Sequence, residues 1–147
     1  MTSILVLNGP NLNLLGTRQP DVYGHDTLDD VEQMCRDHGK AHGVTVDCLQ
    51  SNYEGELVTW IHEARGTYDG IILNAGAYTH TSVALADAVK GTEAKMVELH
   101  ISNVHAREAF RHHSYLSAVA IGVMAGFGVR GYTLAIDALL GHLEDAA

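Results

Sequence analysis

The sequence predicts an α/β fold in which one parallel sheet is covered by helices on both faces. Two observations support this class. Short apolar runs of strand length alternate with segments of helical periodicity along the whole chain. The runs are rich in valine, isoleucine and leucine, which is typical of strands buried on both faces. The 147 residues suit one folding unit, so we expect residues 1–147 to form a single domain.

Each element has a local signal in the sequence. Thr27 is expected to be the N-cap of the first helix, because Asp29 and Asp30 then fall in its first turn, and Gly43 is expected to end that helix. The last helix carries an apolar stripe that begins at Tyr132. The predicted strands are 3–7, 44–49, 71–74, 95–100 and 118–123, and the remaining predicted helices are 54–65 and 81–90.

Five strand–helix units of this length favour a flavodoxin-like three-layer fold with strand order 2-1-3-4-5 over a six-stranded dinucleotide fold. In such a sheet, ligands bind beyond the carboxyl ends of the strands, near the switch point between the first and third strands. The residues at and just after these strand ends are unusually polar. They include Asn8, Asn11, Asn13, Ser51, Asn52, Asn74, His100, Ser102 and Asn103. We therefore predict a site at that edge.

Charge and composition exclude several classes of function. Nine basic against eighteen acidic residues give a net charge of −9, so polyanions are repelled and we expect no nucleic-acid partner. No apolar run reaches the roughly 18 residues of a membrane span. The first residues also lack the features of a signal peptide, so we expect a cytoplasmic protein without membrane association. Cys35 and Cys48 are expected to be reduced core residues.

Two further patterns are interpreted as structural. Residues 126–131 fit G-x-G-x-x-G, but no strand follows them, so we expect these glycines to serve tight turns and close helix packing rather than nucleotide binding. His112 and His113 are adjacent and do not face one point. The histidine spacings do not resemble a zinc set, and H-E-x-x-H is absent, so we expect no metal.

The loop from Asn8 to Gly24 is the first candidate for chemistry. A loop of this length in a small domain is often functional, and we expect a lid over about residues 16–25. This segment contains Arg18 and Tyr23. A guanidinium beside a phenol favours the phenolate, which can take a proton from carbon. The alternative interpretation is an exposed loop without a role.

The segment after the fourth predicted strand is the second candidate. Glu98 and His100 lie two apart on a strand and so on one face, where the carboxylate can orient or charge the imidazole. Ile101 and Ser102 offer backbone N–H groups before a short predicted helix, which is a natural anion cradle.

A cationic pair follows in the same segment. Arg107 and Arg111 are i,i+4 neighbours in an otherwise acidic chain. Together with the cradle they indicate a small hydroxylated carboxylate as ligand. A capped helix with a solvated basic face is the structural alternative.

These segments resemble the type II 3-dehydroquinate dehydratase family over essentially the whole chain. The motifs are NGPNLNLLG at 8–16, R-x-P at 18–20, YG at 23–24, NAGAYTHTS at 74–82, HISNVHARE at 100–108 and FRHHS at 110–114. Gln19 stands where the family usually has Glu, and Ala118 where it often has Pro. The resemblance implies a catalytic domain that converts 3-dehydroquinate to 3-dehydroshikimate and water, in the shikimate or quinate pathway, by anti elimination through an enolate.

The resemblance also implies catalytic roles. Tyr23 would remove the proton at C2, and Arg18, helped by Arg107, would hold Tyr23 as phenolate. Asn11 would stabilise the enolate oxygen through an ordered water. The remaining catalytic residues are His100, which would protonate the leaving C1 hydroxyl, and Glu98, which would orient His100.

Substrate binding is implied for a further set of residues. The carboxylate would be held by Asn74 and the amides of Ile101 and Ser102, and the ring hydroxyls by His80, Asp87 and Arg111. The family assembles as a dodecamer, a tetramer of trimers, in which Asp87 reaches a neighbouring site. No cofactor is implied, and an iminium route is disfavoured because Lys40, Lys90 and Lys95 lie away from the predicted site.

The alternative function is a flavodoxin-like small-molecule binding module without catalysis. A flavin carrier would have a Ser/Thr/Gly-rich loop after the first strand, where this chain has NGPNLN. A response receiver would have acidic residues where Asn8 and Asn74 stand. Both are less consistent with the sequence than the dehydratase.

Overall fold

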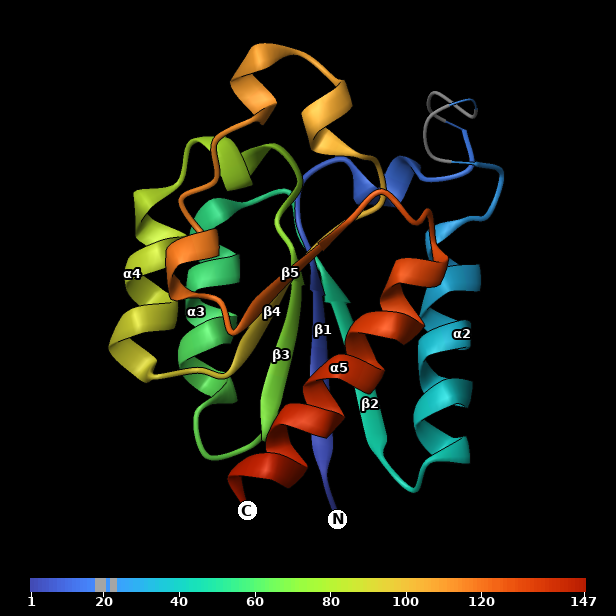
Figure 1. Ribbon diagram of the computed structural model, residues 1–147, viewed down its shortest axis with the longest axis vertical. Coiled ribbons are helices and arrows are strands. Elements are labelled where there is room, and N and C mark those ends of the chain that lie inside the picture. The colour runs from blue at the N-terminus through green and yellow to red at the C-terminus, as the bar shows by residue number, and fades with distance from the viewer. Residues whose placement is uncertain (18–20, 22–23) are drawn as a thin grey trace.

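The computed structural model describes residues 1–17, 21 and 24–147. They form three layers, with a central sheet between helices on its two faces (Figure 1). All four strand pairs are parallel, and the strand order is β2-β1-β3-β4-β5. The predicted flavodoxin-like fold class and strand order are confirmed.

Strands and helices alternate along the chain. The strands are β1 (Ser3–Asn8), β2 (Thr45–Gln50), β3 (Gly70–Asn74), β4 (Met96–His100) and β5 (Gly122–Ala125). The α-helices are α2 (Leu28–Ala41), α3 (Glu54–Ala64), α4 (Val83–Thr92) and α5 (Arg130–Ala146). Short 3-10 helices form parts of the connections: η1 (Leu12–Leu14), η2 (Gly76–His80), η3 (Val104–Ala106), η4 (Ala109–Arg111) and η5 (Ser117–Val119). Within the described ranges, no helix is long and apolar enough to cross a bilayer.

The ends of α2 follow their sequence signals. The Thr27 hydroxyl accepts a hydrogen bond from the Asp30 amide, and the Asp30 carboxylate accepts one from the Thr27 amide. Hydrogen bonding of the Asp30 carboxylate with the backbone amide and then the side chain of Thr27 lowers the pKa of Asp30. Gly43 follows the helix with φ +69°, a conformation that glycine adopts without strain. The predicted start and end of α2 are therefore confirmed.

Two predictions after β4 are wrong in detail. The fifth strand was expected at 118–123, but residues 117–119 form η5 and β5 begins at Gly122. The Ser114 hydroxyl accepts hydrogen bonds from the Leu116 and Ser117 amides, which turns the chain before the strand. The short helix expected after Ser102 is replaced by η3 and η4. An apolar run alone does not distinguish a strand from a turn.

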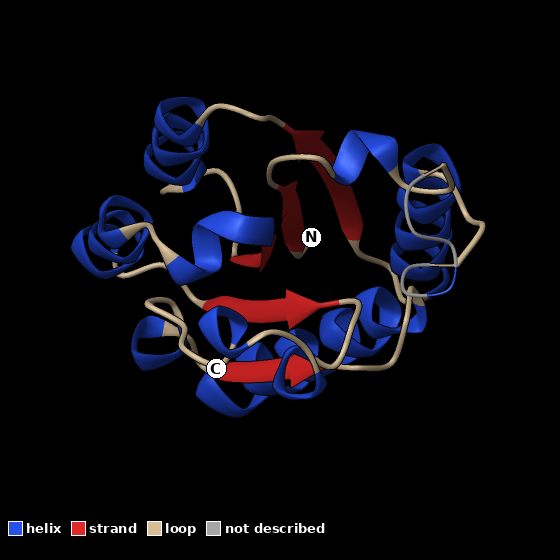
Figure 2. Ribbon diagram, turned by 90° about the horizontal axis from the view of Figure 1, so that it is seen from above, coloured by secondary structure: helices blue, strands red, loops and turns tan. Residues whose placement is uncertain are grey.

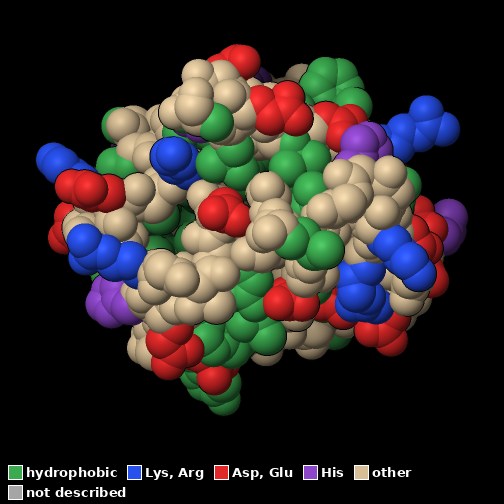
Figure 3. All heavy atoms as spheres, turned by 90° about the horizontal axis from the view of Figure 1, so that it is seen from below, with side chains coloured by type: hydrophobic (Ala, Val, Ile, Leu, Met, Phe, Trp, Pro, Cys, Tyr) green, Lys and Arg blue, Asp and Glu red, His purple; other side chains and the backbone are tan. Residues whose placement is uncertain are grey.

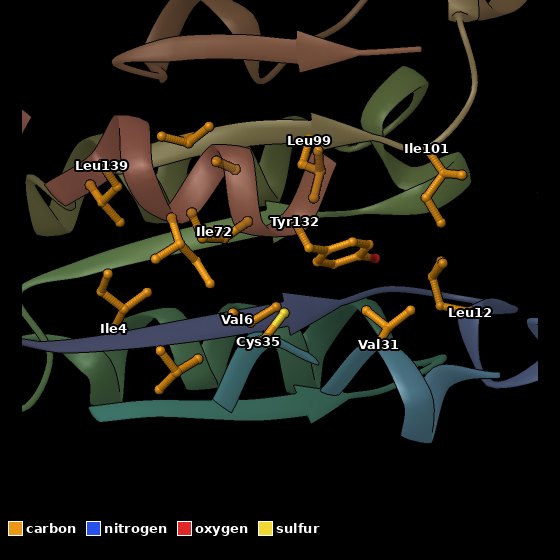
Figure 4. Packing of buried hydrophobic residues seen from close by; sticks show 14 of the residues in the cluster. Ile4, Val6, Leu12, Val31, Cys35, Ile72, Leu99, Ile101, Tyr132 and Leu139 are labelled. Atoms are coloured by element: carbon orange, nitrogen blue, oxygen red, sulfur yellow. The ribbon is translucent and has the colours of Figure 1, made fainter. Parts of the chain in front are cut away.

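Two apolar cores lie on the two faces of the sheet. Helices α2 and α5 cover one face, and α3 and α4 cover the other (Figure 2). In the first core, Tyr132 and Leu139 of α5 point toward Val6 of β1 and Ile72 of β3 (Figure 4). Leu139 packs directly over Gly70, where an added Cβ would lie 2.8 Å from the leucine side chain. The absence of a side chain at this strand position lets α5 approach the sheet.

We expect Leu139→Ala to lower the free energy of unfolding by about 2–5 kcal/mol, because it leaves a cavity in a fully buried position. Urea unfolding followed by circular dichroism would measure the change. Leu134→Ala on the same helix is the matched control, since Leu134 is 44% exposed and its loss should cost less than about 0.5 kcal/mol. Equal effects of the two substitutions would contradict this description of the core.

Candidate active site

A pocket opens at the carboxyl ends of β1, β3 and β4, at the switch point where the strand order reverses. It holds about 620 Å³ of empty space, part of it open to solvent. The opposite end of the sheet carries mixed acidic, basic and apolar side chains (Figure 3). Of the residues predicted from the sequence, the pocket is lined by Asn11, Asn74, His80, His100, Ile101, Ser102, Arg107 and Arg111.

The floor of the pocket is formed where the loops after β1 and β3 cross. The Gly9 amide donates to the Asn74 carbonyl at 2.8 Å. A Cβ at Gly9 would lie 2.5 Å from the carbonyl oxygen of Ala75, so the crossing requires glycine there. Asn11 follows with φ +69°, a left-handed conformation that asparagine tolerates, and its amide donates to Asn52 Oδ1 at 3.0 Å. The N-G-P-N motif thereby brings Asn11 to the pocket.

Glu98 and His100 form the buried pair that the strand spacing predicted. Nε2 of His100 lies 2.5 Å from Oε2 of Glu98, and both side chains are less than a tenth exposed. Because a carboxylate accepts, His100 donates through Nε2. Nδ1 is then the ring nitrogen that remains for a ligand in the pocket. The carboxylate on its far side holds the imidazole ring in this orientation.

Two serines complete the surroundings of Glu98. Ser117 and Ser114 donate to Oε1 of Glu98 at 2.6 Å and 3.0 Å. Burial alone would raise the pKa of Glu98, but the hydrogen bonds from His100 and the serines outweigh it and hold the pKa below its ordinary value. Glu98 is therefore a buried anion held ionised by three hydrogen bonds, one each from His100, Ser114 and Ser117.

Asn74 is held by a network that reaches into the core. Its Nδ2 donates to the Tyr132 hydroxyl at 3.0 Å, and its Oδ1 accepts from the Gly76 amide at 3.3 Å. Tyr132 in turn donates to Oδ1 of Asn8 at 2.5 Å. Burial raises the pKa of Tyr132, although the hydrogen bond from Asn74 opposes this, so the phenol stays protonated. Its hydroxyl thus orients both asparagines, by donating to Asn8 and by accepting from Asn74.

The predicted anion cradle lies in the pocket wall. No hydrogen bond joins the N–H groups of Ile101 and Ser102 to another group in the described part of the chain. Arg107 donates to the Ser102 hydroxyl at 3.2 Å and brings its guanidinium beside these amides. Two backbone N–H groups of this kind beside a guanidinium can bind the two oxygens of a carboxylate.

His80 and Arg111 form the outer wall. His80 donates through Nδ1 to the carbonyl of His113 at 2.8 Å, and its ring lies 6.2 Å from that of His100. Burial lowers the pKa of His80, and the positive charges of His100 and Arg111 lower it further. A neutral His80 therefore offers its Nε2 lone pair to a hydroxyl. Arg111 is held at 3.1 Å by Glu108.

Two predicted site residues that the structure describes, Glu98 and Asp87, do not line the pocket. Arg18 and Tyr23 lie outside the described residues. Asp87 is exposed on α4 and is not part of the pocket of its own chain. All three lysines of the chain are described, and none of them lines the pocket.

The sequence analysis did not identify Tyr132, Ser114 or Ser117 as site residues. Tyr132 was interpreted as part of an apolar stripe, and its hydroxyl role depends on two asparagines more than 50 positions away. Ser114 belongs to the FRHHS motif at 110–114, and this motif is the one feature of the sequence that could have identified it as a site residue. Within the described part of the chain, the one group of three metal-ligating side chains that the geometry brings together lies outside this pocket.

Comparison with known proteins identifies the family. The family model described as "Dehydroquinase class II" matches residues 2–140. The chain belongs to this family. The 3-dehydroquinate dehydratase of Ruegeria pomeroyi is 62% identical over 144 residues, covering 98% of this chain and 97% of the relative. The 3-dehydroquinate dehydratase 2 of Ralstonia nicotianae is 63% identical over 145 residues, covering 95% and 94%.

The solved structures agree with this assignment. The crystal structure of type II dehydroquinase from Butyrivibrio crossotus matches with a TM-score of 0.93 and 44% identity, covering 95% of this chain and 97% of that one. The dehydroquinase resemblance stated from the sequence motifs is confirmed, and with it the enzyme class, a hydro-lyase.

We expect Ser117→Ala to raise the pKa of Glu98 and to cost about 1.5–3 kcal/mol of stability at pH 7, because it removes a hydrogen bond to a buried anion. A carboxyl group whose pKa is lower in the folded than in the unfolded state stabilises the fold at pH values above its unfolded pKa, which is about 4.3 for glutamate. This stabilisation is lost as the pH falls through the pKa of the folded state. The difference between wild type and variant should therefore shrink below about pH 4.

Carboxyl NMR titration of Glu98 and urea unfolding at several pH values would measure both effects. Ser117→Thr keeps the hydroxyl and is the control. A pKa of Glu98 that is the same in Ser117→Ala and wild type would refute the assigned role of Ser117.

Proposed function

We propose that this type II dehydroquinase dehydrates 3-dehydroquinate in the pocket at the strand ends, by anti elimination through an enolate. The observation that carries the proposal is the His100–Glu98 pair. It places an imidazole with a buried anionic partner in the same pocket as two unbonded amides. A substrate with one carboxylate and one departing hydroxyl needs this combination of a proton donor and an anion cradle.

The first step breaks the C2–H bond. Tyr23, which lies outside the described residues, takes this proton as a phenolate that Arg18 and Arg107 stabilise. The electron pair moves onto the C3 oxygen and forms the enolate. Asn11 reaches that oxygen through a water molecule, and its carboxamide is unbonded to other described residues, which supports this role.

The second step breaks the C1–O bond. His100 donates the proton held on Nδ1 to the departing hydroxyl, which leaves as water, and the enolate collapses to the conjugated ketone. Glu98 stabilises the imidazolium before the transfer and keeps the ring oriented after it. Tyr23 loses its proton to solvent before the next turnover, and His100 regains one.

Substrate binding uses the remaining lining residues. The carboxylate accepts from the amides of Ile101 and Ser102 and from the second Nδ2 hydrogen of Asn74, since the first is committed to Tyr132. His80 and Arg111 bind ring hydroxyls. Asp87 contributes to the site of a neighbouring chain, in line with its position on the exposed face of α4.

The route needs no cofactor. An iminium would require a lysine amine in the pocket, and Lys40, Lys90 and Lys95 lie elsewhere. The enolate is stabilised by hydrogen bonds and the leaving group by an acid, which together supply what the elimination requires. A cytoplasmic location stays a prediction of the sequence, as does the extent of the lid over residues 16–25 of a single catalytic domain.

The assembly is proposed to be a dodecamer, a tetramer of trimers. Two exposed apolar side chains support further burial of surface on assembly, namely Val123 on the edge strand β5 and Ile121 directly before it. Light scattering coupled to size-exclusion chromatography should give a mass about twelve times that of the chain. A monomer at micromolar concentration would contradict the proposed assembly.

The decisive experiment follows the ultraviolet absorbance of the conjugated enone after 3-dehydroquinate is added. We expect the band to grow with the wild-type protein and about 10²–10⁴-fold more slowly with His100→Ala, because the leaving hydroxyl loses its acid. Added imidazole should restore part of the rate. His62→Ala, an exposed histidine on α3, is the control and should leave turnover unchanged.

The controls separate the mechanism from its alternatives. Turnover should be indifferent to EDTA and to borohydride, which test for a metal and for an iminium. Near-wild-type turnover in His100→Ala would exclude it as the acid. If the folded and assembled protein forms no enone, the dehydratase proposal is wrong and the alternative function, a binding module without catalysis, remains.

A further inference from the structure

Helices α2 and α5 carry a cluster of potential metal ligands that the active site does not use. His38 lies in the last turn of α2, His42 is the C-cap residue four positions later, and Asp137 of α5 lies beside them. Nε2 of His38 lies 2.6 Å from Oδ1 of Asp137, and the two imidazole rings are 4.5 Å apart. One ligand atom from each of the three residues falls within 4.8 Å of the other two.

The hydrogen bonding of His42 prepares it as a ligand. Its Nδ1 lies 2.8 Å from the carbonyl oxygen of His38. A carbonyl oxygen accepts, so Nδ1 carries the hydrogen, and in the neutral ring the lone pair is on Nε2. Metal-binding histidines commonly donate their second ring N–H to a backbone carbonyl, which fixes ring orientation and tautomer in this way. His42 therefore has this arrangement before any ion is bound.

The contact between His38 and Asp137 provides the other two ligands. Their two atoms share one hydrogen at 2.6 Å. A divalent ion in place of that hydrogen needs ligand atoms about 2.0–2.2 Å from itself and about 3.3 Å from each other. Side-chain rotation is enough to reach this geometry, because all three side chains are at the surface or half-buried. Glu144 lines the same hollow as His42 and Asp137 and adds negative charge that attracts a cation.

We propose that His38, His42 and Asp137 form a binding site for a divalent transition-metal ion of the zinc class, with water in the fourth position. Two imidazoles and one carboxylate are a donor set that Zn²⁺ accepts with tetrahedral geometry. Binding replaces the hydrogen between His38 and Asp137, and His38 then coordinates through Nε2 in the tautomer that carries its hydrogen on Nδ1. The ion joins α2 to α5, the two helices that cover one face of the sheet, so it stabilises their packing rather than the chemistry in the pocket.

The test uses the full chain without an affinity tag, first stripped with EDTA and then titrated with Zn²⁺ alone by calorimetry and equilibrium dialysis. We expect one saturable equivalent per chain and a rise in Tm. His42→Ala and Asp137→Asn should each weaken that binding at least about tenfold and remove the rise in Tm. His62→Ala is the matched control and should bind like wild type, since His62 is an exposed helical histidine outside the cluster.

NMR of the histidine ring signals identifies the ligands directly. Zinc should shift the ring signals of His38 and His42 but not that of His62. Dehydration of 3-dehydroquinate should be unchanged in all three variants, so a failure of this site is separate from a failure of the proposed reaction. The absence of saturable zinc binding overturns the proposal. So does binding of wild-type affinity in His42→Ala or Asp137→Asn, because the ion would then be held by other histidines.

Discussion

The Tyr132 hydroxyl is the polar group on which the site most depends, because it is buried in an apolar core and joins the ends of two strands. Its proton goes to Asn8 at the end of β1, and its lone pair receives a hydrogen from Asn74 at the end of β3. An unpaired hydroxyl in this position would cost about 1–3 kcal/mol, so both asparagines are held at the switch point. α5 is thereby connected to the pocket that it does not line.

The polar groups at this edge of the sheet fall into two sets. One set is hydrogen-bonded within the protein and fixes positions, as the side chains of Tyr132 and Glu98 do. The other set lines the pocket with groups that make no hydrogen bond to another described residue, namely the amides of Ile101 and Ser102 and the second ring nitrogens of His80 and His100. Because the first set is bonded to the protein, the second set is oriented before a ligand arrives, and less ordering is left for binding.

The segment between β4 and β5 shows how one side chain serves both fold and site. The Ser114 hydroxyl accepts hydrogen bonds from two backbone amides, and these bonds turn the chain ahead of β5. The same hydroxyl donates to Glu98 and helps to keep that carboxylate ionised. The turn that displaced the fifth strand from its predicted position is thus also the structure that surrounds the carboxylate partner of His100.

The sequence by itself determined the fold class, the strand order and most of the pocket lining. Strand and helix periods are local properties, and residues that directly follow parallel strands must meet at one edge. The spacing of Glu98 and His100 likewise fixed their pairing, since side chains two apart on a strand share a face.

Tertiary structure decided the contacts between residues far apart in the chain. The roles of Tyr132 and Ser117 depend on partners brought by the sheet, and Asp137 meets His38 and His42 because α5 packs on α2. The start of β5 was also decided there, because its register with β4 pairs Val97 with Gly122 after a serine-capped turn. Periodicity specifies which face of an element is buried, but it does not specify which side chain of another element lies opposite.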